Sequence, residues 1–485
     1  MENMMERPMT FTQLLALVGS PSFEGAICAD SRRVEPGDVF VAVKGTHADG
    51  HDFIAQAQEN GASCIVCQEP AKSTGGDVVV VDDSASAMGL LAQQSFGNPS
   101  AQLTNLAVTG TNGKTTVSYL VRSVIETAGA KCGLIGTIVY DTGTVAADAT
   151  LTTPDALAVA RLARKTADDG GEFMVIEASS HALSQNRLAG VDFTAAAFTN
   201  LTGDHLDYHK TAEEYLAAKM RLFTQLPCHA TAILNVESPA ARRIAQNVTT
   251  RLLWYGIDTD ANIAAHINSM DADRTLFTLS FDGQQELVQT TLIGRHNVSN
   301  HLAAAGLSLA AGFDLATIAK GLSSLKAVPG RLEAVDCGQD FTVLVDYAHT
   351  DDALKNVLAT LRPLTKNNLT VLFGCGGDRD KTKRPRMAKV AEELADRIVV
   401  TSDNPRTENP GAIIEHIVAG FTDPNAENIT VQTDRRTAIE EAIASAERGD
   451  IVLLAGKGHE TCQIIGTEKI DFDDRNFARQ CLQNI

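Results

Sequence analysis

The chain has 485 residues, enough for about three domains of ordinary size. It carries 41 Lys and Arg against 60 Asp and Glu, a formal net charge of −19. This excess of negative charge excludes a general electrostatic attraction to nucleic acid or anionic lipid, so any phosphate must be held at a local site. With 44% hydrophobic and 21% charged residues, the composition is that of a globular protein and not of a disordered one.

No segment predicts export or membrane insertion. The first ten residues contain acids and no apolar core, and the longest apolar stretch, 302–313, is shorter than the roughly 20 residues that span a bilayer. We therefore expect a cytoplasmic protein whose nine cysteines are free thiols. Cys64 and Cys67 form a CxxC pattern, but their strand-like run and the lack of a second pair argue against a zinc or redox role.

Residues 1–99 contain short apolar runs that predict the strands of a small α/β domain. The runs lie at 38–45, 62–67 and 77–83. The segment FGNPS at 96–100 has the residues of a turn or linker. We place the first domain boundary there.

Residues 100–330 alternate buried-type strands with helical segments. This alternation predicts a central, mostly parallel sheet of the phosphate-loop type with helices on both faces. The turn AVPGR at 327–331 marks the second boundary. The predicted strands lie at 106–110, 172–179, 193–201 and 231–237, and a buried helix is predicted at 296–312.

Residues 331–485 repeat the alternation, which predicts a C-terminal Rossmann-like domain. Three of its strands lead into loops rich in charged and glycine residues: GCGGDRD, SDNPR and AGKGHE. Ligands of open α/β sheets bind at the carboxyl ends of strands, so we expect these loops to form a pocket. The predicted strands lie at 341–347, 369–374, 397–403, 429–434 and 450–456.

The segment VTGTNGKTT at 108–116 predicts a phosphate-binding loop. Glycines allow backbone N–H groups to surround phosphates, Lys114 can reach the terminal phosphates, and the Thr115 hydroxyl can bind Mg²⁺. The full Walker pattern requires glycine where this chain has Val108, so the motif is a shorter variant. A chance glycine-rich turn is the alternative, which the preceding strand and following helix disfavour.

An apolar strand in MVIEASSH at 174–181 leads into Glu177. Alone, this residue would be an ordinary strand-end carboxylate. Beside a phosphate loop, an acid at the tip of a strand is typical of a magnesium ligand.

Two histidines, His205 and His209, are spaced four residues apart in DHLDYH. On a helix they would share a face and could bind zinc. The absence of an HExxH motif argues against catalytic zinc, and a pair of hydrogen-bonded histidines is the alternative.

The segment at 211–226 predicts a helix with a lysine in its apolar stripe. Steps of three and four residues place Lys219 among Tyr215, Leu216, Leu222 and Phe223. The alternative is a lysine that snorkels to solvent. A buried amine would have a lowered pKa, and its neutral form could react with CO₂ to give a carbamate that binds metal.

Seven segments in this order resemble the Mur ligases, the ATP-dependent amide-forming ligases of cytoplasmic peptidoglycan precursor synthesis. They are TGTNGKTT, the glutamate of IEASSH, DHLDYH, the lysine of AAKMRLF, GRHNVSN, PGRLE and VDYAHT. The resemblance covers essentially the whole chain. DSR at 30–32, FVAVKGTHADGHDF at 40–53 and DNPR at 403–406 are similar to the segments with which one member recognises a UDP-sugar and diaminopimelate.

The resemblance implies a monomer that uses ATP, UDP-N-acetylmuramoyl-L-alanyl-D-glutamate and meso-diaminopimelate, with Mg²⁺ as cofactor and no nucleic-acid partner. It implies a UDP-sugar domain (1–99), an ATP domain (100–330) and an amino-acid domain (331–485). The implied catalytic residues are Lys114, Glu177, His205 and Lys219, and the implied metal ligands are Thr115, Glu177, His205 and Lys219 as a CO₂-derived carbamate.

The resemblance also implies three sets of binding residues. Those for ATP are Gly110, Thr111, Asn112, Gly113, Lys114, Thr115, Thr116, Asn297, Asn300, Arg331 and Asp346. Those for the nucleotide-sugar peptide are Ser31, His47, Thr152, Thr153, Ser179, Gln185 and Arg187. Those for diaminopimelate are Arg379, Asp403, Asn404, Pro405, Arg406, Gly456 and Glu460.

Arg406 is implied as the residue that distinguishes diaminopimelate from lysine. Diaminopimelate has a second carboxylate where lysine has none, and an arginine can clamp a carboxylate with two hydrogen bonds. A cation there would also repel the ammonium of lysine. Without the family resemblance, the Asn-Pro pair would favour a simple turn that closes a strand.

Two other functions remain as alternatives. Folylpolyglutamate synthase shares the phosphate loop and the ligase chemistry, but in that family the loop lies near the start of the chain. A nucleotide switch or motor would also use such a loop, but the chain has no NKxD guanine motif.

Overall fold

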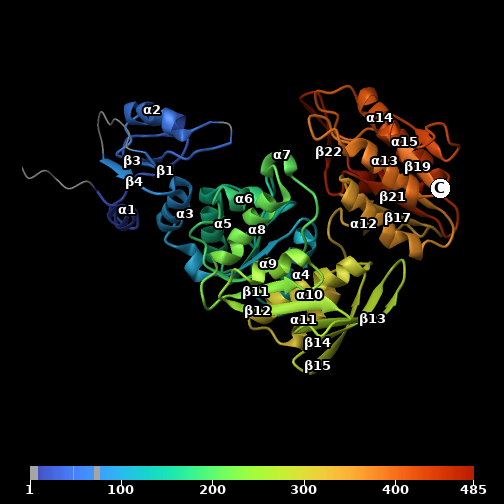
Figure 1. Cartoon of the computed structure of the whole chain (residues 1–485), viewed down its shortest axis with the longest axis horizontal. Helices are drawn as coiled ribbons and strands as arrows, with labels where there is room; N and C mark the ends of the chain where they lie inside the picture. The colour runs from blue at the N-terminus through green and yellow to red at the C-terminus, as the bar shows by residue number, and fades with distance from the viewer. Residues whose placement is uncertain (1–8, 47, 70–76, 485) are drawn as a thin grey trace, which may run out of the picture.

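The computed structural model describes residues 9–46, 48–69 and 77–484, and three sheets follow one another along the chain. Figure 1 shows the central sheet between the N-terminal and the C-terminal ones. Every strand and helix that the sequence predicts is present, most of them somewhat shorter than predicted. The mixed α/β class is therefore confirmed.

The N-terminal sheet has four parallel strands in the order β1-β2-β3-β4. Side chains alternate between its faces, so Cys64 packs with Leu14 of α1, while Cys67 packs with Ile54 of α2. The two cysteines thus face opposite sides, and all nine cysteines are free, as predicted. The elements are α1 (Phe11–Val18), β1 (Ile27–Cys28), β2 (Val39–Val41), α2 (Ile54–Glu59), β3 (Cys64–Cys67), β4 (Asp77–Val80) and α3 (Ser84–Ser95).

The central sheet has 11 strands in the order β15-β14-β13-β12-β11-β10-β5-β9-β6-β7-β8. Its middle is parallel and carries the predicted strands. Those of the middle and one end are β5 (Thr104–Thr109), β6 (Cys132–Ile135), β7 (Val139–Asp141), β8 (Ala146–Asp148), β9 (Phe173–Glu177), β10 (Phe193–Phe198) and β11 (Thr231–Asn235). The others are β12 (Arg251–Ile257), β13 (Ile263–Met270), β14 (Thr275–Phe281) and β15 (Gln284–Thr290).

Helices cover both faces of this sheet, as predicted. One buried core lies against α4, α10 and α11, and a second lies against α5, α6, α8 and α9 on the other face. The helices are α4 (Lys114–Thr127), α5 (Ala156–Asp168), α6 (Ser180–Ser184), α7 (Leu206–His209), α8 (Ala212–Thr224), α9 (Pro239–Ala245), α10 (Arg295–Ala310) and α11 (Leu315–Ser324).

Antiparallel strands extend both ends of the central sheet, which the sequence did not predict. At one end β13, β14 and β15 form a meander, and at the other β6, β7 and β8 do so. Strand β15 is mostly polar and buries only Val288 and Thr290, so it lacks the continuous apolar run of the buried parallel strands.

The C-terminal sheet has the order β16-β17-β21-β18-β19-β20, and all pairs but β16-β17 are parallel. Helices α12, α13 and α14 pack on one face, and α15 and α16 on the other. A hairpin, β22-β23, lies apart from the sheet. The strands are β16 (Glu333–Ala334), β17 (Thr342–Asp346), β18 (Leu369–Phe373), β19 (Arg397–Val400), β20 (Ile429–Val431), β21 (Ile451–Ala455), β22 (Cys462–Ile465) and β23 (Glu468–Asp471). The helices are α12 (Asp351–Leu361), α13 (Lys383–Leu394), α14 (Pro410–Val418), α15 (Arg435–Ala444) and α16 (Asp474–Gln483).

Short 3-10 helices connect several of these elements. They are η1 (Ser31–Arg33), η2 (Gly50–Phe53), η3 (Pro99–Gln102) and η4 (Arg362–Leu364). No helix in the described ranges is long and apolar enough to cross a membrane.

Candidate active site between the central and C-terminal sheets

The phosphate loop connects β5 to α4, as the motif predicts. Gly113 has a φ of 92°, a left-handed conformation that glycine adopts without strain, and a Cβ there would lie 2.3 Å from Asn300 Oδ1. The Nζ atom of Lys114 donates to the carbonyls of Gly110 and Thr111, each at 2.9 Å. The ammonium is therefore held within the curve of the loop.

Glu177 lies beside this loop because β9 pairs with β5, with Val108 opposite Glu177. The carboxylate is fully buried and accepts from the hydroxyls of Thr115 at 3.0 Å and Thr137 at 2.9 Å. The Thr137 amide also donates to it at 3.1 Å. A carboxylate beside a threonine hydroxyl is the oxygen-donor chemistry that Mg²⁺ prefers, so these residues fit a magnesium site.

The side chain of Lys219 extends from α8 to the same loop and is buried. Its residue is 1% exposed, so the alternative of a lysine that snorkels to solvent is wrong. Its Nζ donates to the Gly110 carbonyl at 2.8 Å and lies 4.5 Å from the centre of the Tyr215 ring. Burial, with a further contribution from the Lys114 charge, lowers the pKa of Lys219 well below the ordinary value, which favours the neutral amine.

His205 and His209 do not share a helix face, so that premise of a zinc pair is wrong. Helix α7 begins at Leu206, and His205 has a φ of 53°, which the right-handed helix does not allow. Instead the two rings pack around His181, with centroids 4.9 and 5.5 Å away. In the described residues no three Asp, Glu, His or Cys side chains gather as a metal site, so a metal there would need other donors such as Thr115.

A cavity of about 280 Å³ lies between the central and C-terminal sheets and contains most of the predicted ATP residues. The C-terminal residues Arg331 and Asp346 face the phosphate loop across it, and Arg331 Nη2 lies 3.4 Å from Thr115 Oγ1. Asp346 accepts from the Leu332 and Ala348 amides at 2.7 and 2.8 Å, which fixes the chain around Arg331. The predicted residues that line the cavity are Thr111, Asn112, Gly113, Lys114, Thr115, Thr116, Thr152, His205, Asn297, Asn300, Arg331 and Asp346.

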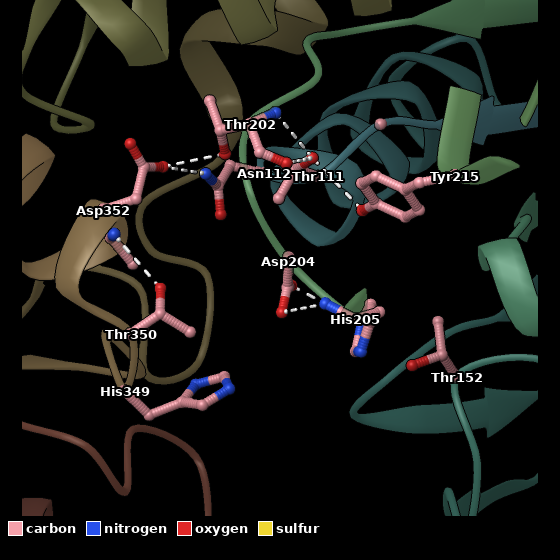
Figure 2. A network of polar contacts seen from close by, with 12 residues as sticks. Thr111, Asn112, Thr152, Thr202, Asp204, His205, Tyr215, His349, Thr350 and Asp352 are labelled. Atoms are coloured by element: carbon pink, nitrogen blue, oxygen red, sulfur yellow. Dashed lines mark hydrogen bonds and ion pairs between the residues drawn. The ribbon is translucent and has the colours of Figure 1, made fainter. Parts of the chain in front are cut away.

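The cavity also contains residues that the sequence analysis did not propose. His349 and Thr350 follow β17, as Tyr347 does, and His296 opens α10. His349 was part of the VDYAHT segment, so its position after a predicted strand could have suggested it. Figure 2 shows His349 and His205 on opposite sides of this space.

Helix α12 contacts the phosphate loop directly. Asp352 Oδ2 accepts from Asn112 Nδ2 at 3.2 Å and from Thr202 Oγ1 at 2.9 Å (Figure 2). Thr111 is held from the other side, by the Thr202 amide at 3.0 Å and the Tyr215 hydroxyl at 3.1 Å. The loop that would hold phosphates is thus connected to the C-terminal sheet by a carboxylate.

The residues predicted for the nucleotide-sugar peptide form a network beside Glu177. Thr153 Oγ1 donates to the Glu177 carbonyl at 2.6 Å and accepts from the Ser179 amide at 3.1 Å. Arg187 donates to the Thr153 carbonyl at 2.8 Å and to Gln185 Oε1 at 2.7 Å. These four residues and Thr152 are thus brought together.

Two other residues predicted for that substrate belong to the N-terminal part. Ser31 is buried in η1, where its hydroxyl donates to Gln56 at 2.8 Å. His47 lies outside the described residues.

The residues predicted for the amino acid come from loops after β18, β19 and β21. Asp403, Asn404 and Pro405 are buried, and Arg406 has a φ of 50° with its guanidinium donating to the Gly377 carbonyl at 2.8 Å. Gly456 has a φ of 112°, and a Cβ there would lie 2.7 Å from Asp403 Oδ2.

Other members of this predicted set differ in exposure and bonding. Glu460 accepts from Asn404 Nδ2 at 2.8 Å, whereas Arg379 is exposed and bonds to the Asp378 carbonyl at 3.0 Å. Lys457 was not predicted as a site residue, although it is fully buried and its Nζ lies 2.9 Å from Glu460 Oε2. Its place in AGKGHE beside two proposed residues was the available indication.

Three family models match the chain along its length. The Mur ligase family, catalytic domain, matches residues 25–95, the Mur ligase middle domain matches 108–308, and the Mur ligase, glutamate ligase domain, matches 330–458. Together they span all three sheets.

Curated relatives and solved structures are similar over nearly the whole chain. A Geobacillus thermodenitrificans protein named UDP-N-acetylmuramoyl-L-alanyl-D-glutamate–2,6-diaminopimelate ligase is 46% identical over 464 residues, 94% of each chain. A Bacillus licheniformis protein of the same name is 44% identical over 488 residues, covering 98% of this chain and 99% of that protein. A solved structure with that name has 34% identity and a TM-score of 0.68, covering 95% and 94% of the two chains.

A folylpolyglutamate synthase from Mycobacterium tuberculosis has a similar fold. Its TM-score is 0.61 at 17% identity, and the match covers 75% of this chain and 91% of that one. At this identity the likeness concerns the fold alone.

Proposed function

The chain belongs to the Mur ligase family, and from that premise we propose that it is an ATP-dependent ligase that joins meso-2,6-diaminopimelate to UDP-N-acetylmuramoyl-L-alanyl-D-glutamate. The observation that carries the proposal is the cavity in which Lys114 and Thr115 of the phosphate loop face Arg331 and Asp346 of the C-terminal sheet. This arrangement joins a phosphate site to the loops that would bind an incoming amino acid.

The proposed reaction has two steps. The γ-phosphoryl group of ATP moves to the side-chain carboxylate of the D-glutamate, giving an acyl phosphate and ADP. The amine of diaminopimelate then attacks the acyl carbon, loses a proton, and forms the amide as phosphate leaves. Catalysis of phosphoryl transfer is mostly positioning and charge stabilisation, which suits the cations around this cavity.

The phosphate loop and the cations beside it would hold ATP. Lys114 and the loop amides would contact the phosphates, and Arg331 would approach them from the C-terminal side. Thr115 and Glu177 would hold Mg²⁺, which when bound neutralises phosphate charge. The full ATP set proposed from the sequence remains Gly110 to Thr116, Asn297, Asn300, Arg331 and Asp346.

Lys219 is proposed to act as a carbamate. Its burial and the nearby Lys114 charge lower the pKa of the amine, and a neutral amine can add CO₂. The product carries a negative charge where the lysine carried a positive one, and it would bind a second metal together with Glu177 and His205. Lys114 and Lys219 both donate to the Gly110 carbonyl, which supports a position of the Lys219 carbamate beside the phosphates.

The three domains would then hold one substrate each. The N-terminal domain (1–99) would bind the UDP group near Ser31 and His47, and the network around Thr153 and Arg187 would bind the muramoyl-dipeptide. The central domain (100–330) would bind ATP. The C-terminal domain (331–485) would bind diaminopimelate, with Arg406 on its second carboxylate because a guanidinium can clamp a carboxylate at two points.

The test is phosphate release from ATP with different acceptors. We expect release only when the UDP-muramoyl-dipeptide and diaminopimelate are both present, and much slower release when lysine replaces diaminopimelate. Full-rate release with neither substrate would instead indicate a nucleotide switch. Release with a folate and glutamate would indicate a folylpolyglutamate synthase, and either result would contradict the proposal.

A further inference from the structure

One lysine of the C-terminal part is buried next to the proposed amino-acid pocket. Lys457 follows β21 and is 0% exposed, whereas lysine is among the residues most rarely buried. Its Nζ donates to Glu460 Oε2 at 2.9 Å, to Asn404 Oδ1 at 3.2 Å and to the Cys462 carbonyl at 2.6 Å. An ammonium has three N–H donors, so all of them are used within the protein.

These bonds fix which way the Asn404 amide points. Its Oδ1 accepts from Lys457 and also from the Ile464 amide at 2.9 Å, so the oxygen must face these two donors. The nitrogen is therefore at the opposite side, where it donates to Glu460 Oε2 at 2.8 Å. A flipped amide would place its NH₂ group against two donors and would lose all of these bonds.

The same bonds orient the Glu460 carboxylate. Its Oε2 atom accepts from both Lys457 and Asn404, while Oε1 has no hydrogen bond within the described part of the chain. Glu460 is partly exposed, so Oε1 can meet a ligand. The second N–H of Asn404 is likewise not engaged by any described residue.

The hairpin β22-β23 completes the support. Gln463 Nε2 donates to the Asp403 carbonyl at 2.6 Å, and Arg406 exchanges backbone bonds with the hairpin through Ile464 at 3.1 Å and Gly466 at 2.7 Å. Lys457 contacts this hairpin through Cys462. One buried ammonium thus connects the β21 loop, the β19 loop and the hairpin.

We propose that Lys457 is a positioning residue that sets the amino-acid specificity of the pocket. It acts by holding the Asn404 amide and the Glu460 carboxylate so that they present an N–H donor and a carboxylate oxygen on the same side. Such a pair matches the carboxylate and the ammonium of one α-amino-acid centre, next to Arg406. Because Lys457 is buried, it acts through these two residues. The inference rests on the proposed function, since it concerns the ligand of that pocket.

The test is Lys457→Met, which keeps the length of the side chain and removes its three donors. Loss of hydrogen bonds to charged groups predicts a KM for diaminopimelate raised roughly 10- to 100-fold, with the KM for ATP changed less than about twofold. Free lysine, as an alternative substrate, lacks the second α-amino-acid centre. The low kcat/KM for lysine should therefore fall less than that for diaminopimelate, and the ratio of the two values should decrease. The matched control is Lys469→Met, an exposed lysine of β23, which should leave all constants unchanged.

A second comparison covers the case in which the single variant does not fold. Lys457→Met/Glu460→Gln removes both charges of the pair, and it is compared with Glu460→Gln alone. We expect a further rise in the diaminopimelate KM in the double variant, because Asn404 is then free to flip.

The two failures are distinguishable. No diaminopimelate-dependent phosphate release from the wild type contradicts the proposed function and the inference with it. Wild-type ligation, together with an unchanged diaminopimelate KM in Lys457→Met or in the double variant relative to Glu460→Gln, overturns the inference alone. Equal rises in the KM for ATP and for diaminopimelate also overturn it, because they indicate a general structural role.

Discussion

The phosphate loop and the proposed amino-acid pocket differ in how their buried basic side chains are paired. Beside the loop, Lys114 and Lys219 both donate to the Gly110 carbonyl, and neither forms an ion pair among the described residues. Beside the pocket, Lys457, Arg384 and Arg435 each bond to a carboxylate: Glu460, Glu408 and Asp474.

The difference distinguishes basic side chains that can serve a ligand from basic side chains that stabilise the fold through ion pairs. Burial is the largest cause of the lowered pKa of both Lys114 and Lys219, and the Lys114 charge lowers the pKa of Lys219 further. Anionic phosphates would favour the charged form of Lys114, so its charge is available to a ligand, whereas Lys219 is proposed to become an anionic carbamate that binds metal. The paired cations of the proposed pocket are already neutralised, which would leave Arg406 and Arg379 for ligand carboxylates. A chain with a net charge of −19 can therefore bind anions at a few placed cations.

The variant Lys219→Ala gives the largest expected effect. If Lys219 serves catalysis and not the fold, we expect a loss of activity of roughly a hundred- to a thousandfold, as when a preorganised group of an active site is removed. Thermal stability should change little, because removing a buried unpaired amine costs no ion pair. Steady-state phosphate release and calorimetry measure the two effects.

Two controls connect that loss to the carbamate. Lys219→Arg keeps a cation that cannot form a carbamate, and it should be as inactive as alanine. Low pH protonates the Lys219 amine and removes the carbamate, so wild type depleted of CO₂ in this way should lose activity. Bicarbonate supplies CO₂ again and should restore part of that activity. Near-normal turnover of Lys219→Ala would contradict the proposal.

Arg435→Met tests the opposite case, a cation that holds the fold. Arg435 and Asp474 are at most 1% exposed and form two bonds, at 2.9 and 2.6 Å. Removing one partner leaves a buried unpaired carboxylate, which costs about 3–5 kcal/mol. Calorimetry should show a lowered melting temperature, while the exposed neighbour variant Arg436→Met should show a small change. Equal melting temperatures for the two variants would contradict this role.

The sequence predicted the phosphate loop well because its information is local. Strand, glycine turn, lysine and helix follow one another within 108–116, and Lys219 could be recognised from helical periodicity. The AGKGHE segment could have indicated that Lys457 lies near the site, but not that it is buried, because its burial depends on Asn404, which is distant along the chain, and on the hairpin. Whether a lysine is buried depends on tertiary contacts, and the residue type alone predicts that a lysine is exposed.

The fold shows the same limit. The parallel strands β5, β9, β10 and β11 of the central sheet were predicted because they are continuous apolar runs. The parallel strands β6 and β12 and the half-exposed antiparallel strands β13 to β15 were not predicted. The expectation that His205 and His209 share a helix face is wrong because of one backbone angle: the φ of 53° at His205 keeps this residue outside helix α7, which begins at Leu206. No spacing rule detects such a residue.

Arg406→Ala sharpens the distinction within the pocket. Its guanidinium bonds to a backbone carbonyl and not to a carboxylate, so we expect it to serve the ligand. The KM for diaminopimelate should rise roughly 10- to 100-fold, the range for a lost charged hydrogen bond, and the KM for ATP should stay near the wild-type value. Arg406→Lys should restore the KM for diaminopimelate only in part, since an ammonium lacks the planar fork of a guanidinium. Equal effects on both substrates would make Arg406 structural.

The contact between the two regions gives the smallest expected effect. Asp352 of α12 accepts from Asn112 and Thr202 on the phosphate-loop side, whereas its neighbour Asp351 pairs with Arg386 within the C-terminal part at 2.8 Å. The net contribution of a typical hydrogen bond is about 0.5–1.5 kcal/mol, and solvent at the partly exposed Asp352 carboxylate weakens both of its bonds, so Asp352→Ala should lower kcat/KM for ATP by roughly five- to tenfold. Asp351→Ala removes the same charge from the same helix turn and should change it less than about twofold. If both variants lose the same amount, the effect belongs to the helix terminus, and the contact across the cavity does not couple the loop to the pocket.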